Sequence, residues 1–176
     1  MRTFSGKRST LALRLPEWCE APQVLINGEA AQGEQLKGYL HITRQWQQGD
    51  IITLRLPMTL RRVYANPLVR HNAGKVAIQR GPLVYCLEEV DNSAELHNLS
   101  LPKASQIREI PGTGVLKGKI VLQAEGLRVL TAQEDKPLYS FDHRQTAVEK
   151  QTLTFIPWFS WANRGEGEMR IWINEA

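Results

Sequence analysis

The sequence has 176 residues, 42% of them hydrophobic and 23% charged, a composition that excludes intrinsic disorder. The net charge of +4 comes from 22 basic and 18 acidic residues that are dispersed along the chain, whereas nucleic-acid binders cluster their basic residues, so no nucleic-acid partner is expected. No run of 18 apolar residues occurs and the first ten residues lack an apolar segment, which predicts a cytoplasmic protein without a membrane partner.

Alternation of apolar and polar residues, which is typical of half-buried strands, dominates the first third of the chain. It appears at residues 10–15, 39–46 and 51–57. Asn27-Gly28 follows a short β-branched run, and this dipeptide favours a type I′ turn because both residues tolerate a positive φ. These patterns predict antiparallel strands joined by tight turns.

The remaining sequence predicts more strands and less regular connections. Two apolar runs lie within residues 75–89, on either side of Gly81-Pro82, and residues 91–114 are expected to form mostly loop and short extended pieces. Further strands are predicted at 118–130, 138–142, 150–158 and 168–173. No window of 12 or more residues keeps a helical period of 3.6.

Short strands with frequent turns predict an all-β fold made of two small antiparallel β-sandwich, jelly-roll-like units. The polar stretch "RHNAGK" is flanked by strands, and the boundary is therefore placed beside it. We predict one unit at residues 1–78 and a second at residues 79–176.

Paired carboxylates are the first candidates for catalysis, because glycosidases use two. Glu88 and Glu89 are adjacent and would point to opposite faces of a strand, whereas Glu166 and Glu168 are expected to flank a glycine-rich turn. The local group "SFDH" at 140–143 lacks the surrounding motif of a serine nucleophile. No catalytic residue is predicted.

Metal sites and reactive thiols also find little support in the residue pattern. The four histidines are scattered singly, and Cys19 and Cys86 form no metal-binding spacing, so no metal or other cofactor is predicted. The two cysteines stand in apolar contexts, where they would be small buried hydrophobic residues, and a disulfide between them is the open alternative.

Aromatic residues near the C-terminal end form the most distinctive stretch, "IPWFSWANRGEGEMRIW" at 156–172. Tryptophan rings can stack on sugars, and they can equally fill a core or an interface. In an extended final strand, Trp172 would share a face with Arg170 and Asn174 and would need cover from a ligand, another domain or a partner chain. The candidate carbohydrate-binding or interface residues are Trp158, Trp161, Arg164 and Trp172.

Five blocks of the chain, in order, resemble the C-terminal part of glycoside hydrolase family 127, the β-L-arabinofuranosidase-like enzymes. They are "LALRLPEW" at 11–18, "VLINGE" at 24–29, "WQQGDIITLRLPM" at 46–58, "VAIQRGPLVYCLE" at 76–88 and "IPWFSWANRGEGEMRIW" at 156–172. The blocks cover most of the chain apart from residues 90–150. The fourth and fifth are the specific ones.

The resemblance implies a parent enzyme with an (α/α)6 barrel followed by two β-sandwich domains. In a characterised subgroup the nucleophile is a zinc-bound cysteine and the acid/base is a glutamate, and all of these residues belong to the barrel. They precede the first matched block, and Cys86 stands outside the nucleophile motif, so no catalytic residue is carried over. Zinc is expected only in the barrel.

We therefore expect a non-catalytic accessory region that supports the helical barrel and self-associates as a homodimer. The first alternative is a stand-alone module that binds carbohydrate through exposed tryptophans. The second alternative is an oligomerisation module. The sugar and the linkage cleaved by the parent are not specified by the sequence, because one fold serves many substrates.

Overall fold

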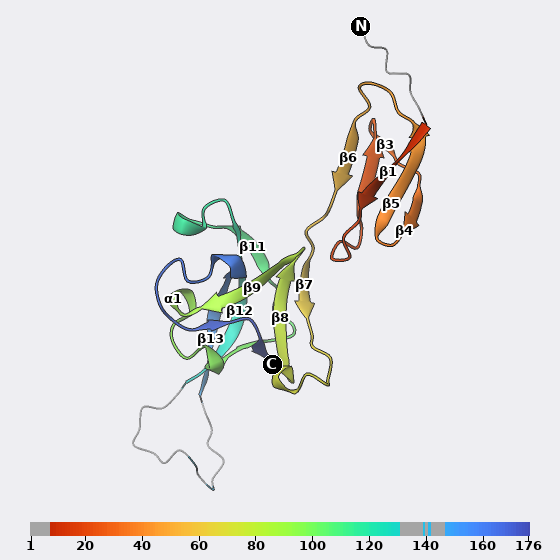
Figure 1. Ribbon diagram of the computed structural model, residues 1–176. Helices are drawn as coiled ribbons and strands as arrows, with labels where there is room; N and C mark the ends of the chain where they lie inside the picture. The colour runs from red at the N-terminus through yellow and green to blue at the C-terminus, as the bar shows by residue number, and fades with distance from the viewer. Residues whose placement is uncertain (1–7, 131–138, 140, 142–146) are drawn as a thin grey trace. The chain divides into compact units, whose positions relative to one another are not determined.

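A computed structural model describes residues 8–130, 139, 141 and 147–176, and it confirms the all-β prediction (Figure 1). The chain divides into two compact units, the first ending at Thr59 and the second beginning at Leu60. The predicted strand at 138–142 lies outside the described residues, except for positions 139 and 141, which are not in strands.

The first unit contains two three-stranded antiparallel sheets. One has the order β1-β5-β4 and the other β3-β2-β6. The strands are β1 (Arg8–Arg14), β2 (Gln23–Ile26), β3 (Glu29–Ala30), β4 (Glu34–Leu36), β5 (Tyr39–Gln45) and β6 (Ile52–Arg55). Val24 and Ile26 of one sheet share a core with Ile42 of the other, so the two sheets form a small sandwich.

Tight turns set the register of this unit. Asn27 and Gly28 have φ values of 53° and 89°, as a type I′ hairpin requires. Asn27 also donates from Nδ2 to Asp50 Oδ1 (2.8 Å) and accepts the Ile51 N–H at Oδ1 (2.8 Å). The predicted hairpin is therefore present, and its first residue also fixes the turn before β6.

The second unit contains nine strands in one continuous hydrogen-bonded sheet. They are β7 (Leu60–Val63), β8 (Lys75–Arg80), β9 (Leu83–Glu88), β10 (Leu99–Leu101), β11 (Arg108–Pro111), β12 (Ile120–Val129), β13 (Val148–Pro157), β14 (Met169–Arg170) and β15 (Ile173–Glu175). The short helices are α1 (Glu89–Asn92), η1 (Arg70–Asn72), η2 (Leu96–Asn98), η3 (Gly114–Leu116) and η4 (Trp158–Ser160).

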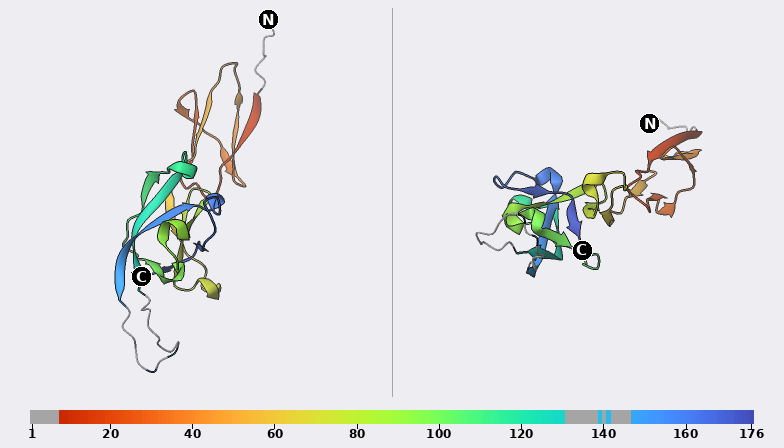
Figure 2. Two further views of the ribbon diagram at one scale, coloured as in Figure 1. Left: turned by 90° about the vertical axis from the view of Figure 1, so that its left-hand side faces the viewer. Right: turned by 90° about the horizontal axis from the view of Figure 1, so that it is seen from below.

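This sheet closes on itself. Strand β9 pairs with β13 on one edge and with β8 on the other, and the path from β13 through β12, β10 and β15 returns to β8. The long strands β12 and β13 lie side by side in this path (Figure 2). The side chains of the main buried cluster come from every strand of the ring, including Tyr85, Leu122, Phe155 and Ile173. The strands of the second unit thus form a closed hydrogen-bonded ring around one core, and its β10–β15 pair is parallel.

The unit boundary differs from the predicted one. Residue 78 falls inside β8, which pairs with β7 on one edge and β9 on the other. The polar stretch at 70–75 that suggested a boundary is instead the connection between β7 and β8. Because β7 is held by this non-local pairing, the division lies between Thr59 and Leu60.

Two further strand predictions can be compared with the structure. Residues 91–114, expected to be mostly loop and short extended pieces, contain the short strands β10 and β11, which agrees with that prediction. The expected final strand at 168–173 is interrupted by a bend at 171–172, so that β14 pairs with β9 whereas β15 pairs with β8 and β10. Alternation continues through the bend, which is why the sequence pattern did not reveal it.

Candidate functional site

The candidate region is the loop from η4 to β14, residues 158–168, in the second unit. Its centre is Arg164, whose guanidinium is held between two carboxylates. Arg164 Nε donates to Glu88 Oε2 (3.1 Å), Nη1 donates to Asp91 Oδ1 (2.9 Å), and Nη2 contacts both acids. Glu88 is only 5% exposed, whereas Arg164 and Asp91 are partly buried, so the charge cluster is largely shielded from solvent.

The electrostatics of this cluster favour the charged state of Arg164. Hydrogen bonding to Asp91, and to a smaller extent to Glu88, raises the pKa of Arg164 above its ordinary value, although burial lowers it. Glu88 also accepts the Ala162 N–H at Oε1 (2.9 Å). The cluster therefore fixes the loop in one conformation instead of leaving a carboxylate available to a substrate.

Helix α1 positions Asp91 for this contact. Its last residue, Asn92, is fully buried and donates from Nδ2 to the carbonyl oxygens of Glu88 (2.9 Å) and Thr154 (2.9 Å). The Thr154 N–H donates in return to Asn92 Oδ1 (2.8 Å). One turn of helix is thereby attached to β13, and Asp91 points to Arg164.

The far end of the loop is attached by Glu168. Its N–H donates to Glu89 Oε2 (2.8 Å), and the Glu89 N–H donates to the Glu168 carbonyl oxygen (3.0 Å). The Glu168 carboxylate accepts the Leu96 N–H (2.8 Å). Glu88, Glu89 and Glu168, which had been weighed as catalytic carboxylates, thus all hold the fold. Glu166 is exposed and has no hydrogen bond or ion pair among the residues that the structure describes.

The aromatic residues divide into an exposed group and a half-buried one. Trp158, Phe159 and Trp161 are 49%, 58% and 42% exposed. Trp172 lies in the bend between β14 and β15 and is half-buried within this unit. The structure therefore places Trp158, Trp161 and Arg164 in one loop, and Trp172 in a separate segment with part of its surface already covered.

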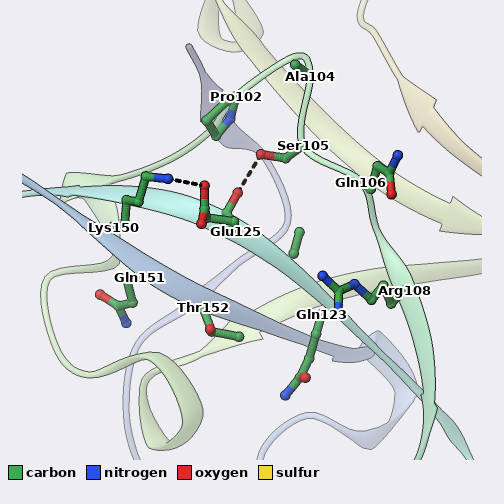
Figure 3. A pocket seen from close by; sticks show the side chains of 11 residues that line it. Pro102, Ala104, Ser105, Gln106, Arg108, Gln123, Glu125, Lys150, Gln151 and Thr152 are labelled. Carbon is green, nitrogen blue, oxygen red and sulfur yellow. Dashed lines mark hydrogen bonds and ion pairs between the residues drawn. The ribbon is translucent and has the colours of Figure 1, made fainter.

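A shallow depression opens beside Trp161. It is lined by Trp161, Ala162, Gly165, Glu166 and Gly167. A larger groove of about 600 Å³ lies between the 102–108 segment and strands β12 and β13 (Figure 3). The described residues of its lining are mostly polar and include no aromatic residue, and Lys150 Nζ of β13 contacts Glu125 Oε1 of the neighbouring β12 at 2.9 Å.

The two cysteines are free and buried. Burial raises the pKa of the Cys86 thiol to about 12, so it remains protonated near neutral pH and is a poor nucleophile. Within residues 8–130 and 147–176, no group of three or more His, Cys, Asp or Glu side chains is arranged to hold a metal ion. No helix in the described part of the chain is long and apolar enough to span a membrane.

Sequence reasoning missed Glu88 and Asp91 as partners of Arg164. The available signal was Glu88 itself, a charged residue directly after the apolar run of β9. A carboxylate at the end of a buried strand needs a cationic partner. Nothing in the local pattern shows that this partner lies 76 residues later.

Comparison with known proteins gives matches along nearly the whole chain. The protein-family model described as the glycoside hydrolase family 127 C-terminal domain matches residues 60–174. The model described as the β-L-arabinofuranosidase, GH127 middle domain matches residues 2–58. The junction of the two matches agrees with the division of the structure into two units.

Individual relatives agree with these matches. A non-reducing end β-L-arabinofuranosidase of Bifidobacterium longum subsp. longum is 36% identical over 163 residues, which are 90% of this chain and 25% of that protein. The crystal structure of a GH127 β-L-arabinofuranosidase from Geobacillus stearothermophilus T6 superimposes with a TM-score of 0.86 at 44% identity, covering 97% of this chain and 27% of that one.

A solved GH127 β-arabinofuranosidase gives a TM-score of 0.82 at 29% identity, with coverage of 97% and 28%. The chain thus spans about a quarter of the length of the relatives that it matches. The resemblance predicted from the five sequence blocks is confirmed.

Proposed function

The chain belongs to glycoside hydrolase family 127, and we propose that it acts as the non-catalytic accessory region of a β-L-arabinofuranosidase, supporting a separate helical barrel that carries the reaction. The relatives are about four times longer than this chain and are named for that activity. Two family models that describe a middle and a C-terminal domain account for nearly all of its residues.

The observation that carries the proposal is that the acidic residues around the 158–168 loop are engaged in hydrogen bonds within the chain. The carboxylates of Glu88, Glu89 and Glu168 accept hydrogen bonds from Arg164 or from backbone N–H groups. A glycosidase needs one carboxyl group that can donate a proton and a second that can attack or activate water. These side chains serve instead to hold the 158–168 loop on α1 and β9.

The exposed aromatic side chains of Trp158 and Phe159 supply a surface for the supporting role. Both stand at the start of the loop on η4, and such neighbouring exposed rings are typical of contact surfaces. We propose that they contact the barrel of the parent enzyme. Zinc, which the family resemblance implies, would reside in that barrel.

Self-association is the second candidate, because the same exposed rings could meet those of another copy. Light scattering over a concentration series distinguishes self-association from a barrel contact. A dimer that dissociates when Trp158 is replaced by alanine would favour self-association.

The test of the main proposal uses the chain itself and an aryl β-L-arabinofuranoside, with and without added zinc. We expect no protein-dependent release of the aryl group. Turnover proportional to protein concentration would overturn the proposal. In a second experiment the chain is co-expressed with the barrel-bearing remainder of a family 127 enzyme, and we expect the two to co-purify. Purification of the barrel without the chain would contradict the supporting role.

A further inference from the structure

The depression beside Trp161 is lined by five residues, among them an exposed tryptophan, an exposed glutamate and two glycines. They are Trp161, Glu166, Gly165 and Gly167. We propose that this depression is a non-catalytic binding site for a single neutral sugar ring of a glycan.

The indole matches the apolar part of a sugar. A sugar ring presents C–H groups on one face and hydroxyl groups around its edge, and a flat aromatic ring fits the first of these. Trp161 is 42% exposed, so part of its surface is open to such a ligand. The backbone N–H of Trp161 donates to the Trp158 carbonyl oxygen (3.0 Å), which fixes the backbone that carries the ring.

Glu166 matches the polar edge of the ligand. A carboxylate accepts hydrogen bonds from hydroxyl groups and can take two at once. Glu88, Glu89 and Glu168 are bonded to other groups of the chain, whereas Glu166 has no partner among the described residues. It is therefore the acceptor of this loop that is left for a ligand.

The loop is rigid where a ligand would need it to be. The Ala162 N–H is held by Glu88 Oε1 (2.9 Å), and Asn163 Nδ2 donates to the Ser160 carbonyl oxygen (3.0 Å). Ala162 has a φ of 62°, a backbone conformation that residues other than glycine rarely adopt. The two hydrogen bonds maintain this conformation. A site that is ordered before binding loses little entropy when the ligand arrives.

The charges favour a neutral sugar over an anion or a peptide carboxylate. The one cation of the 158–168 loop, Arg164, is already neutralised by Glu88 and Asp91. Glu166 adds negative charge at the rim and would repel an anionic group. The larger polar groove is a weaker candidate, because none of its described lining residues has a ring for stacking and two of its charged side chains pair with each other.

The test is a titration of the 176-residue chain with methyl β-L-arabinofuranoside and, separately, with methyl α-D-glucopyranoside, followed by NMR. The choice of the pentose rests on the proposed function. We expect saturable shifts confined to the loop. Trp161→Ala should weaken binding roughly tenfold, and Glu166→Gln by roughly threefold to tenfold. Trp158→Ala, an exposed tryptophan outside the depression, is the matched control and should change affinity less than twofold.

Absence of saturable binding to both glycosides overturns the inference, as does binding that survives both Trp161→Ala and Glu166→Gln. If the chain is a dimer that Trp161→Ala dissociates, and neither glycoside gives saturable shifts, the depression is a contact between copies and the inference is wrong. Co-purification with the barrel is measured separately, so failure of the sugar site leaves the supporting role intact.

Discussion

Arg164 and Glu88 lie 76 residues apart in sequence and are joined by hydrogen bonds from Nε, at 3.1 Å, and from Nη2 to the same carboxylate oxygen. This contact attaches the loop that carries Trp158 and Trp161 to the end of β9. Because Glu88 is buried, Arg164 is partly buried and Asp91 completes the cluster, the contact is a structural element of the second unit and is expected to dominate its response to substitution.

Arg164→Ala should destabilise the chain strongly, because it leaves Glu88 buried without a cation. We expect a loss of about 3–5 kcal/mol in the free energy of unfolding. The measurement is urea denaturation followed by circular dichroism. Lys150→Ala is the control, since the Lys150–Glu125 pair is exposed on both sides and should contribute less than about 1 kcal/mol. Equal effects of the two substitutions would contradict this interpretation.

The Cys86 thiol should resist alkylation in the native state. Its pKa of about 12 leaves almost no thiolate at pH 8, and the side chain is inaccessible. A Cys19→Ser variant isolates Cys86 for reaction with a thiol reagent such as Ellman's. We expect reaction only after denaturant is added. Rapid native reaction would show that the core around β9 opens readily.

The carboxyl group of Asp50 should make the first unit sensitive to acid. The Gln47 N–H, then Asn27 Nδ2 and more weakly Arg44, hold the pKa of Asp50 below its ordinary value of 3.8. A depressed folded-state pKa gives a contribution that is present above the unfolded-state pKa and is lost as the pH falls through the folded-state pKa. Asp50→Asn should therefore flatten the pH dependence of unfolding below about pH 4. An unchanged acid profile would be inconsistent with this assignment.

Gly126 should not tolerate a side chain. A Cβ at this position would stand 2.4 Å from Leu153 Cδ1 and 2.9 Å from the Ser100 carbonyl oxygen. Gly126→Ala should cost about 1–3 kcal/mol through overpacking, measured by thermal and urea unfolding. Gly118→Ala is the comparison, because a Cβ at Gly118 would meet no other atom. Its cost would come only from the φ of +82°, which is strained for alanine, and is about 1–2 kcal/mol. A tolerated Gly126→Ala with destabilising Gly118→Ala would reverse the expected order.

The boundary at Thr59 and Leu60 can be tested with fragments. A fragment of residues 60–176 retains β7 and β8 and should unfold cooperatively. A fragment of residues 79–176 loses most of β8, which separates β9 from β15 in the ring, and should not give a dispersed NMR spectrum. Cooperative folding of the shorter fragment would restore the boundary predicted from sequence.

Local sequence rules predicted the local parts of the fold. Asn27-Gly28 forms its hairpin because both φ values are decided within two residues. The interruption at 171–172 was missed because Met169, Ile171 and Ile173 keep their alternation while packing against two different clusters. Of the candidate site, the sequence identified Trp158, Trp161 and Arg164 as neighbours, but it could not reveal Glu88 or Asp91, since that contact depends on tertiary structure.

The position of β15 bears on how the second unit is synthesised. Residues 173–175 lie between β8, about a hundred residues earlier in the sequence, and the parallel strand β10. The ring therefore cannot close on the ribosome until this segment has left the exit tunnel, and the core to which β8, β9 and β12 contribute stays incomplete until then. The first unit, whose pairings all lie within residues 8–55, can fold while the second is still being translated.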